Sequence, residues 1–140
     1  MFFILLQNSW KKLQNYLGLD INDFKRYSGR YILIEKDGKG KEYNGYNDKI
    51  LYEGEYKKGK RNGKGKEYNK EGILIFEGEF LNNKWLNGKE YNEEGILIFE
   101  GDFLNGLRNG KGKEYNYKGK LIFEGEYLNG KRNGKGKEYD

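Results

Sequence analysis

The feature that most constrains this chain is a five-residue motif that returns about every 24 residues. Its order is aromatic, acidic, glycine, acidic, aromatic, and the four clear copies begin at Tyr52, Phe76, Phe99 and Phe123. A degraded copy occupies residues 27–31. Self-similarity at this period predicts a row of small structural units, each of which must bury its apolar face against its neighbours.

A second motif, Gly-Lys-Gly-Lys-Glu-Tyr, closes four units and is shortened to Gly88-Lys89-Glu90-Tyr91 in another. Together the two motifs delimit units at residues 27–43, 52–68, 76–91, 99–115 and 123–139. Both alternate with period 2, which predicts strands, and the Asn- and Gly-rich links predict tight turns. We therefore predict an all-β fold, an elongated single-layer antiparallel meander of about five β-hairpin repeats.

The alternation also assigns residues to faces. One face should carry the aromatic residues and the glycines between them, because a ring can lie across a neighbouring glycine that has no Cβ. These repeat residues are Tyr52, Gly54, Tyr56, Phe76, Gly78, Phe80, Phe99, Gly101, Phe103, Phe123, Gly125 and Tyr127. On the other face, an even turn between units would place Lys64 and Lys66 opposite Glu77 and Glu79, where unlike charges stabilise the sheet. Those charges either contact a partner or keep a thin sheet soluble.

Two units depart from the pattern. Unit 76–91 has Asn83 where its sisters have glycine, and it is one residue short before Gly88. This predicts a kink or an altered loop, strain in the turn, and the least stable part of the array. Unit 27–43 has Ile32-Leu33-Ile34 in place of an Asn-Gly loop, which suggests an adapted cap.

Residues 1–26 form a separate N-terminal segment, followed by the repeat array at 27–140. The spacing of Phe3, Leu6, Trp10 and Leu13 predicts a short helix, which we expect to cap the sheet. A membrane-surface helix and the remnant of a larger domain are alternatives. The apolar run is too short to span a bilayer and lacks a secretory signature, so we expect a cytoplasmic chain, with peripheral membrane attachment as the alternative.

Composition argues against catalysis. The chain has no Cys and no His, so we expect no zinc site or other metal site and no thiol nucleophile. The only serine hydroxyls, Ser9 and Ser28, have no histidine to activate them. Residues 59–66 lack the Ser or Thr of a phosphate-binding loop. We therefore predict no catalytic residues, no cofactor and no enzymatic activity.

The order of these motifs resembles the MORN (membrane occupation and recognition nexus) repeat, and also related bacterial repeats of antitoxin or immunity proteins. The likeness spans residues 27–140. It implies a non-catalytic binding or scaffold protein that engages a protein partner. Attachment to anionic phospholipid, an antitoxin or immunity function, and the regulatory array of a larger enzyme are the alternatives that it leaves open.

Basic residues are the candidate contacts with a partner or with lipid. They are Lys57, Lys58, Lys60, Arg61, Lys64, Arg108, Lys131 and Arg132. An anionic membrane, an acidic protein partner and simple solvation all remain open. A net charge of +5, with acidic residues interleaved, argues against nucleic acid. If residues 134–139 form an edge strand, their backbone could also pair with a second copy, giving a homodimer.

Overall fold

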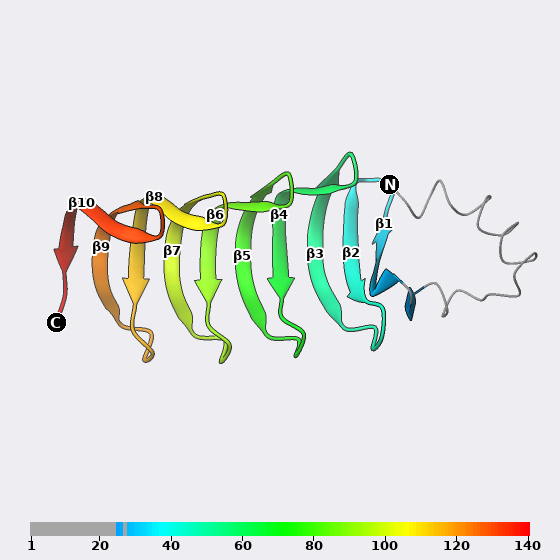
Figure 1. Ribbon diagram of the computed structural model, residues 1–140, viewed down its shortest axis with the longest axis horizontal. Coiled ribbons are helices and arrows are strands. Elements are labelled where there is room, and N and C mark those ends of the chain that lie inside the picture. Colours follow the sequence, from blue (N-terminus) through cyan, green and yellow to red (C-terminus); the bar gives the residue numbers. More distant parts are fainter. Residues whose placement is uncertain (1–24, 27) are drawn as a thin grey trace, which may run out of the picture.

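The computed structural model describes residues 25–26 and 28–140. Ten strands form one antiparallel sheet in chain order, each paired only with its sequence neighbours. Figure 1 shows them side by side along the long axis of the molecule. The strands are β1 (Arg30–Ile34), β2 (Lys39–Asn44), β3 (Ile50–Lys57), β4 (Lys60–Tyr68), β5 (Leu74–Leu81), β6 (Lys84–Tyr91), β7 (Leu97–Leu104), β8 (Leu107–Tyr115), β9 (Leu121–Leu128) and β10 (Lys131–Glu138). The predicted all-β meander of five hairpins is confirmed.

Two kinds of connection alternate along the sheet. Two-residue turns close the four later hairpins, and both central residues of each turn have positive φ, as at Asn105 (52°) and Gly106 (80°). Such turns match the twist of the strands that they join. The longer loops lie along the opposite edge of the sheet (Figure 1). The side-chain oxygen of Asn69 stabilises one of them by accepting hydrogen bonds from the backbone N–H groups of Glu71 and Ile73.

The kink or altered loop predicted for unit 76–91 is wrong at its two-residue turn, whereas the predicted strain and low stability stay predictions. Asn82 and Asn83 adopt φ values of 49° and 71°, so this turn has the same length and shape as its sisters. The Asn83 side-chain oxygen also accepts a hydrogen bond from the Arg61 N–H at 2.8 Å. Asparagine tolerates the left-handed region better than most residues, and here its side chain adds a bond that glycine could not make.

The missing residue is instead absorbed by a β-bulge. In β4, residues 62–64 stand opposite the single residue Glu55 of β3. In β6, only residues 86–87 stand opposite Glu79 of β5. A bulge can lose one residue without moving the strands on either side, because its residues are already outside the regular ladder. The pairing of unit 76–91 with both neighbouring units is therefore preserved.

A line of paired glycines crosses the sheet and lies under the core. Gly65 pairs with Gly54 on one side and with Gly78 on the other, and the same pairing continues to Gly136 in β10. A Cβ on Gly112 would coincide with the ring of Phe99, so the ring occupies the space that the glycine leaves. The rings of the two aromatic positions meet edge to face, as Phe99 and Tyr127 do at 4.9 Å between centroids.

A layer of cationic and aromatic side chains covers these rings on the solvent side. The guanidinium groups of Arg61, Arg108 and Arg132 lie 4.3–4.5 Å from the ring centroids of Tyr52, Phe99 and Phe123. In unit 76–91, Trp85 takes this place and stacks on Phe76 at 4.4 Å. A single sheet can therefore bury Tyr52, Phe76 and Phe99 completely, because each ring lies between a glycine and a covering side chain.

The first unit differs from its prediction. Residues 25, 26 and 28 are helical and β1 begins only at Arg30, so the motif copy at 27–31 does not form a strand like its sisters. In register, Ile34 and not Gly29 stands opposite Gly40. The helical cap predicted over residues 1–26 falls, except for its last two residues, outside the described part of the chain. Among the described residues, no helix is long and apolar enough to cross a membrane.

Candidate functional site

The face opposite the aromatic core carries two rows of charged side chains, one on each side of the glycine line. The first row runs along the sheet with strictly alternating sign. Its members, in order from β2 to β10, are Lys41, Glu53, Lys66, Glu77, Lys89, Glu100, Lys113, Glu124 and Lys137. The ammonium of Lys66 lies 3.5 Å from the carboxylate of Glu77. From Glu53 to Glu124, each charge of this row therefore faces the opposite sign on both neighbouring strands, whereas Lys41 faces Leu33 on β1.

The second row alternates in the same way but has one break. Its members are Lys39, Glu55, Lys64, Glu79, Asn87, Asp102, Lys111, Glu126 and Lys135. Lys64 pairs with Glu79 and Lys66 with Glu77, so the predicted pairing of opposite charges is confirmed. Asn87 stands where the alternation requires lysine and donates its side-chain N–H to Asp102 at 2.6 Å. The result is a local excess of negative charge around Glu79 and Asp102.

Tyrosines at the strand ends extend the first row. The hydroxyl groups of Tyr68, Tyr115 and Tyr139 donate to Glu53, Glu100 and Glu124 at 2.6, 3.3 and 3.2 Å. Burial, together with the bond to Glu53, raises the pKa of Tyr68 to about 12. The hydroxyl therefore stays protonated near neutral pH and keeps its role as a donor to the carboxylate.

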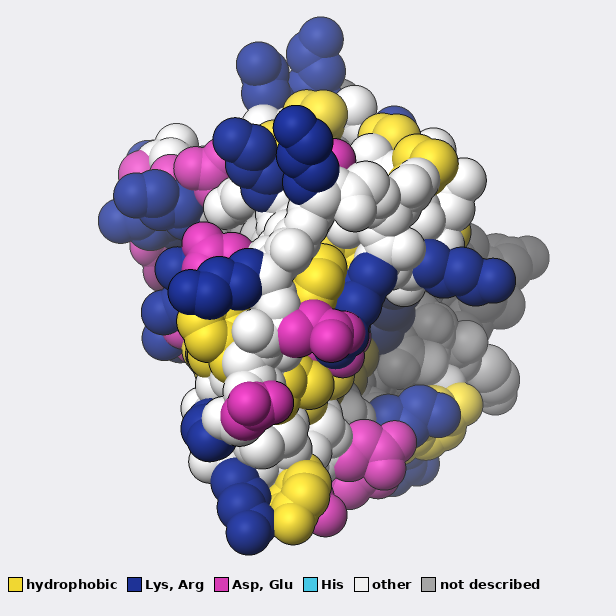
Figure 2. All heavy atoms as spheres, turned by 90° about the vertical axis from the view of Figure 1, so that its left-hand side faces the viewer, with side chains coloured by type: hydrophobic (Ala, Val, Ile, Leu, Met, Phe, Trp, Pro, Cys, Tyr) yellow, Lys and Arg dark blue, Asp and Glu magenta, His cyan; other side chains and the backbone are white. Residues whose placement is uncertain are grey.

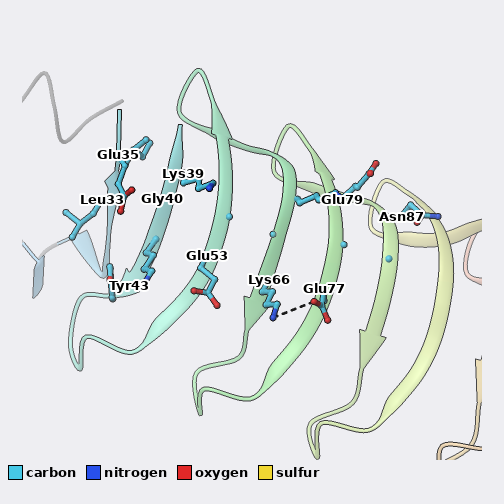
Figure 3. Close-up of a pocket in the computed structure, with 17 residues that line it drawn as sticks. Leu33, Glu35, Lys39, Gly40, Tyr43, Glu53, Lys66, Glu77, Glu79 and Asn87 are labelled. Atoms are coloured by element: carbon cyan, nitrogen blue, oxygen red, sulfur yellow. Dashed lines mark ion pairs between the residues drawn. The ribbon is translucent and has the colours of Figure 1, made fainter. Parts of the chain in front are cut away.

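The two rows border shallow hollows on this face. One hollow of about 740 Å³ extends from β1 to β6 and is floored by Gly40, Gly54, Gly65, Gly78 and Gly88. A second, of about 510 Å³, continues from β6 to β10, and Asn87 lines both. Figure 3 shows the labelled charged side chains of the first hollow rising from successive strands on the same face of the sheet. The charged face therefore presents a long groove with a backbone floor and charged walls.

The predicted contact residues separate into three places. Lys57, Lys58, Lys60 and Lys131 are exposed near the two-residue turns, and Lys64 is exposed in the second charged row. The arginines lie on the aromatic face instead, where Arg61 bonds Glu42 at 2.9 Å, Arg108 bonds Glu90 at 2.8 Å and Arg132 bonds Glu114 at 2.8 Å. The structure thus exposes these lysines at the turns and in the second charged row, and it places the arginines over the aromatic rings, where the Arg132 side chain remains 36% exposed.

Sequence reasoning missed two features of these surfaces. The first is the continuous charged row. The lysines and glutamates that form it are visible in the sequence, but the register that aligns them across the sheet depends on bulges between the units. The second is a set of half-exposed leucines beside the two-residue turns, at Leu81, Leu104, Leu107 and Leu128. A comparison of equivalent positions in the sequence would have found these leucines. Lys57 and Lys60 flank the first two-residue turn, whereas Leu104 and Leu107 flank the equivalent turn between β7 and β8.

These features define a class of protein: an open repeat array whose units differ little in the core and present a long, one-dimensional surface. The sequence profile of the MORN repeat family matches residues 52–72, 99–120 and 123–140, in three of the five hairpins. With its repeating hairpins, the chain is a MORN repeat protein. Repeats of this family are generally binding or scaffold modules and are often associated with membranes. Comparison with curated proteins finds no match.

Proposed function

We propose that this protein is a non-catalytic scaffold that binds a protein partner along its charged face. The observation that carries the proposal is the pair of charged rows on either side of the glycine line. A partner segment lying in the groove between them would meet charges of alternating sign at the spacing of neighbouring strands, about 4.8 Å. An extended peptide with its own alternating charges has the matching chemistry.

Two further observations support this site. The groove is shallow and open, which suits a polypeptide segment better than an enclosed small molecule. The break at Asn87 also distinguishes one part of the groove, because it leaves an acidic region near the centre of an otherwise regular charge pattern. We expect the bound segment to place a basic residue there, between Glu79 and Asp102.

A charge-neutralising variant tests the proposal. The variant K64Q/K66Q/E77Q/E79Q keeps the net charge, because it removes two lysines and two glutamates, and it places no like charges opposite each other, so the sheet should still fold. Its bound proteins would be compared quantitatively with those of the wild type by affinity capture from the source cells. We expect specific partners to be lost from the variant, while circular dichroism stays unchanged. Capture of the same proteins in the same amounts would overturn the proposal.

Contact with anionic membranes is a second candidate, and the edge of the two-residue turns favours it. The half-exposed leucines at 81, 104, 107 and 128 lie along this edge, and exposed lysines 57, 58, 60 and 131 lie beside them. Apolar side chains flanked by lysines can enter the interface of a bilayer while the ammonium groups attract anionic lipid. The charged groove would remain accessible in this orientation.

Flotation with vesicles separates the two candidates. We expect the wild type to bind vesicles containing phosphatidylserine and not vesicles of phosphatidylcholine alone, with binding lost in L104S/L107S. K64Q/K66Q/E77Q/E79Q serves as the matched control, because it alters the groove and leaves the turn edge intact. Equal flotation of wild type and L104S/L107S would contradict membrane contact through this edge.

A further inference from the structure

A row of tyrosines follows the strand ends on the charged face, beside the long loops. Its members are the last residues of β4, β6 and β8, namely Tyr68, Tyr91 and Tyr115. Each pairs with the leucine that opens the next strand, as Tyr68 does with Leu74, and each is half-buried. This tyrosine row is separated from the glycine line by the first charged row, because Lys66 stands between Gly65 and Tyr68 along β4.

The hydroxyl bonds determine how these rings lie. In the pairing of β3 with β4, Glu53 stands opposite Lys66, two residues before Tyr68. The Tyr68 hydroxyl nevertheless donates to Glu53 at 2.6 Å, and Tyr115 donates to Glu100 in the same way at 3.3 Å. A bond to this diagonal neighbour requires the ring to lean across the sheet instead of standing upright from it. The rings therefore lie along the sheet, with one face toward solvent.

The tyrosine row lacks the covering side chains of the aromatic core. Guanidinium groups cover Tyr52 and Phe99, and Trp85 covers Phe76. In the part of the chain that the structure describes, no stacked ring or cation lies over any member of the tyrosine row. An uncovered tyrosine offers a flat apolar surface with a polar tip, on which a ligand can stack.

The glutamates beside these rings keep capacity for a cation. Within residues 25–26 and 28–140, neither Glu53 nor Glu100 forms an ion pair, whereas Glu77 has Lys66 at 3.5 Å. A carboxylate has acceptor sites for about four hydrogen bonds, so the bond from one tyrosine leaves room for a ligand's lysine or arginine. Burial raises the pKa of Tyr91, and Glu77 and Glu100 raise it further, which shows that the middle tyrosine also lies near these carboxylates.

The spacing of the tyrosine row determines which ligand fits it. One tyrosine stands on every second strand, so neighbouring tyrosines are about 9.6 Å apart, twice the distance of about 4.8 Å between strands. A polyproline II helix has three residues per turn and rises about 3.1 Å per residue, so the same face returns after about 9.3 Å. An extended β-strand returns to the same face after about 6.8 Å. Polyproline II therefore has the period of the row, and a β-strand does not.

Overall charge does not select a ligand on this surface. On the side of the molecule drawn in Figure 2, acidic and basic side chains are interspersed, with hydrophobic side chains between them. Figure 3 shows the same mixture on the charged face, where Lys66 lies between Glu53 and Glu77. A ligand is therefore recognised by the spacing of its own rings and charges. Proline-rich segments dock in aromatic-lined grooves, and their preformed helix loses little entropy on binding.

We propose that the tyrosine row binds a basic, proline-rich segment in the polyproline II conformation. One proline of each turn packs on a tyrosine ring. One lysine or arginine of each turn meets the glutamate of the same unit, which is Glu53, Glu77 or Glu100. A segment of about seven residues reaches all three tyrosines. This surface is distinct from the groove between the two charged rows, and its ligand has different chemistry.

Fluorescence anisotropy with the full chain tests the spacing. The probe is a labelled peptide of three Pro-Lys-Gln repeats, and the control peptide has the same composition with its prolines four residues apart. We expect the probe to bind at least tenfold more tightly than the control, because only its prolines return in register with successive tyrosines. On ¹⁵N-labelled protein, the probe should shift the amide resonances at and beside Tyr68, Tyr91 and Tyr115.

Charge variants test the glutamates. E53Q/E100Q keeps an acceptor for both tyrosine hydroxyls, so circular dichroism should be unchanged, while affinity for the probe should fall about tenfold. E71Q/E94Q makes the same change in net charge on exposed glutamates of the long loops, and it should bind the probe like the wild type.

The other outcomes overturn the proposal. Equal affinity for the two peptides, or binding of neither, would mean that the row does not recognise a three-residue period. Full affinity in E53Q/E100Q, or an equal loss in E71Q/E94Q, would mean that the glutamates beside the row do not contact the ligand. Amide shifts confined to the two-residue turns would place the peptide elsewhere. The groove is tested through residues 64, 66, 77 and 79 and through captured proteins, so failure here leaves the proposed scaffold function to be judged by its own test.

Discussion

At the scale of single residues, the structure depends on side chains that lie over the rings. Glu42 is 3% exposed and bonds two guanidinium groups, those of Arg30 and Arg61. Burial alone would lower the pKa of Arg61, but Glu67 and Glu42 outweigh it and raise the pKa, so this buried cation stays charged. The ion pairs hold the guanidinium over the Tyr52 ring, 4.5 Å from its centroid, where it excludes water from the ring.

Tyr56 provides the first prediction. Within residues 25–26 and 28–140, its buried hydroxyl has no hydrogen-bond partner, and the equivalent positions Phe80 and Phe103 carry no hydroxyl. Because an unsatisfied buried hydroxyl costs free energy, Tyr56→Phe should raise the free energy of unfolding by about 1 kcal/mol. Urea denaturation measures it. Tyr127→Phe is the matched control, which should lower stability by about 1 kcal/mol because the Tyr127 hydroxyl donates to Glu114 at 2.9 Å. Equal losses in both variants would contradict this account.

Glu114 provides a prediction about pH. Burial alone would raise the pKa of Glu114, but hydrogen bonds from Arg132 and Tyr127 outweigh it and lower the pKa below its ordinary value of 4.5. A depressed folded-state pKa contributes stability that is present above the unfolded-state value and lost as pH falls through the folded-state value. Glu114→Gln should therefore be less stable than the wild type at pH 7, and the difference should shrink below about pH 4.5. A difference that stays constant between pH 7 and pH 3 would refute this linkage.

At the scale of the structural element, unit 76–91 keeps the repeat intact with different chemistry. Trp85 occupies the position of Arg61, Arg108 and Arg132, and its indole N–H donates to Glu67 at 2.7 Å, as the arginines donate to the preceding glutamates. A neutral ring thus replaces a cation above the aromatic position. The shortened bulge and the tryptophan occur together in one unit, and the unit is packed as well as its sisters: Phe76 is 0% and Phe80 is 2% exposed.

Substitution of Trp85 tests this equivalence. Trp85→Ala should lower the free energy of unfolding by about 3–4 kcal/mol, because it uncovers Phe76 and leaves Glu67 without this donor. Trp85→Arg should recover at least half of that loss, since an arginine restores both the cover and the hydrogen bond. Thermal and urea denaturation give both values. If Trp85→Arg is as damaging as Trp85→Ala, the tryptophan is a contact specific to this unit and not a substitute for arginine.

Hydrogen exchange addresses the turn of the same unit. The Asn83 N–H donates to the Arg61 carbonyl at 3.0 Å, and the equivalent Gly130 N–H donates to the Arg108 carbonyl at 2.9 Å. We therefore expect the Asn83 amide to be protected to within about tenfold of the Gly130 amide. Exchange at Asn83 several hundred times faster than at Gly130 would restore the original expectation of a strained turn.

At the scale of the whole molecule, every described strand pairs only with its sequence neighbours, so stability should accumulate along the array. Removal of residues 119–140 deletes β9 and β10 and leaves β8 as the new edge. We expect the remainder to stay folded, with a urea m-value lower by roughly a fifth, because m scales with the surface that unfolding exposes. Complete loss of β-structure by circular dichroism would mean that the array folds as one indivisible unit.

The sequence by itself determined the period, the pairing of strands in chain order and the two faces. The reason is local: period-2 alternation assigns each side chain to a face, and the short Asn-Gly links leave no room for other connections. The same reasoning placed Lys64 and Lys66 opposite Glu79 and Glu77, which the register confirms.

Only the tertiary structure decided which residues cover the core and where irregularities are absorbed. Arg61 and Trp85 look like surface and loop residues in the sequence, yet they bury the rings, because each bonds a glutamate that lies 18 or 19 positions earlier in the chain. Unit 76–91 is one residue shorter at its bulge and not at its turn, because a bulge lies outside the regular ladder and can shorten without shifting the register of the strands. Gly29 is a similar case. It occupies the glycine position of the sequence motif, yet it is not part of the glycine line, because the pairing of β1 with β2 places Ile34 opposite Gly40.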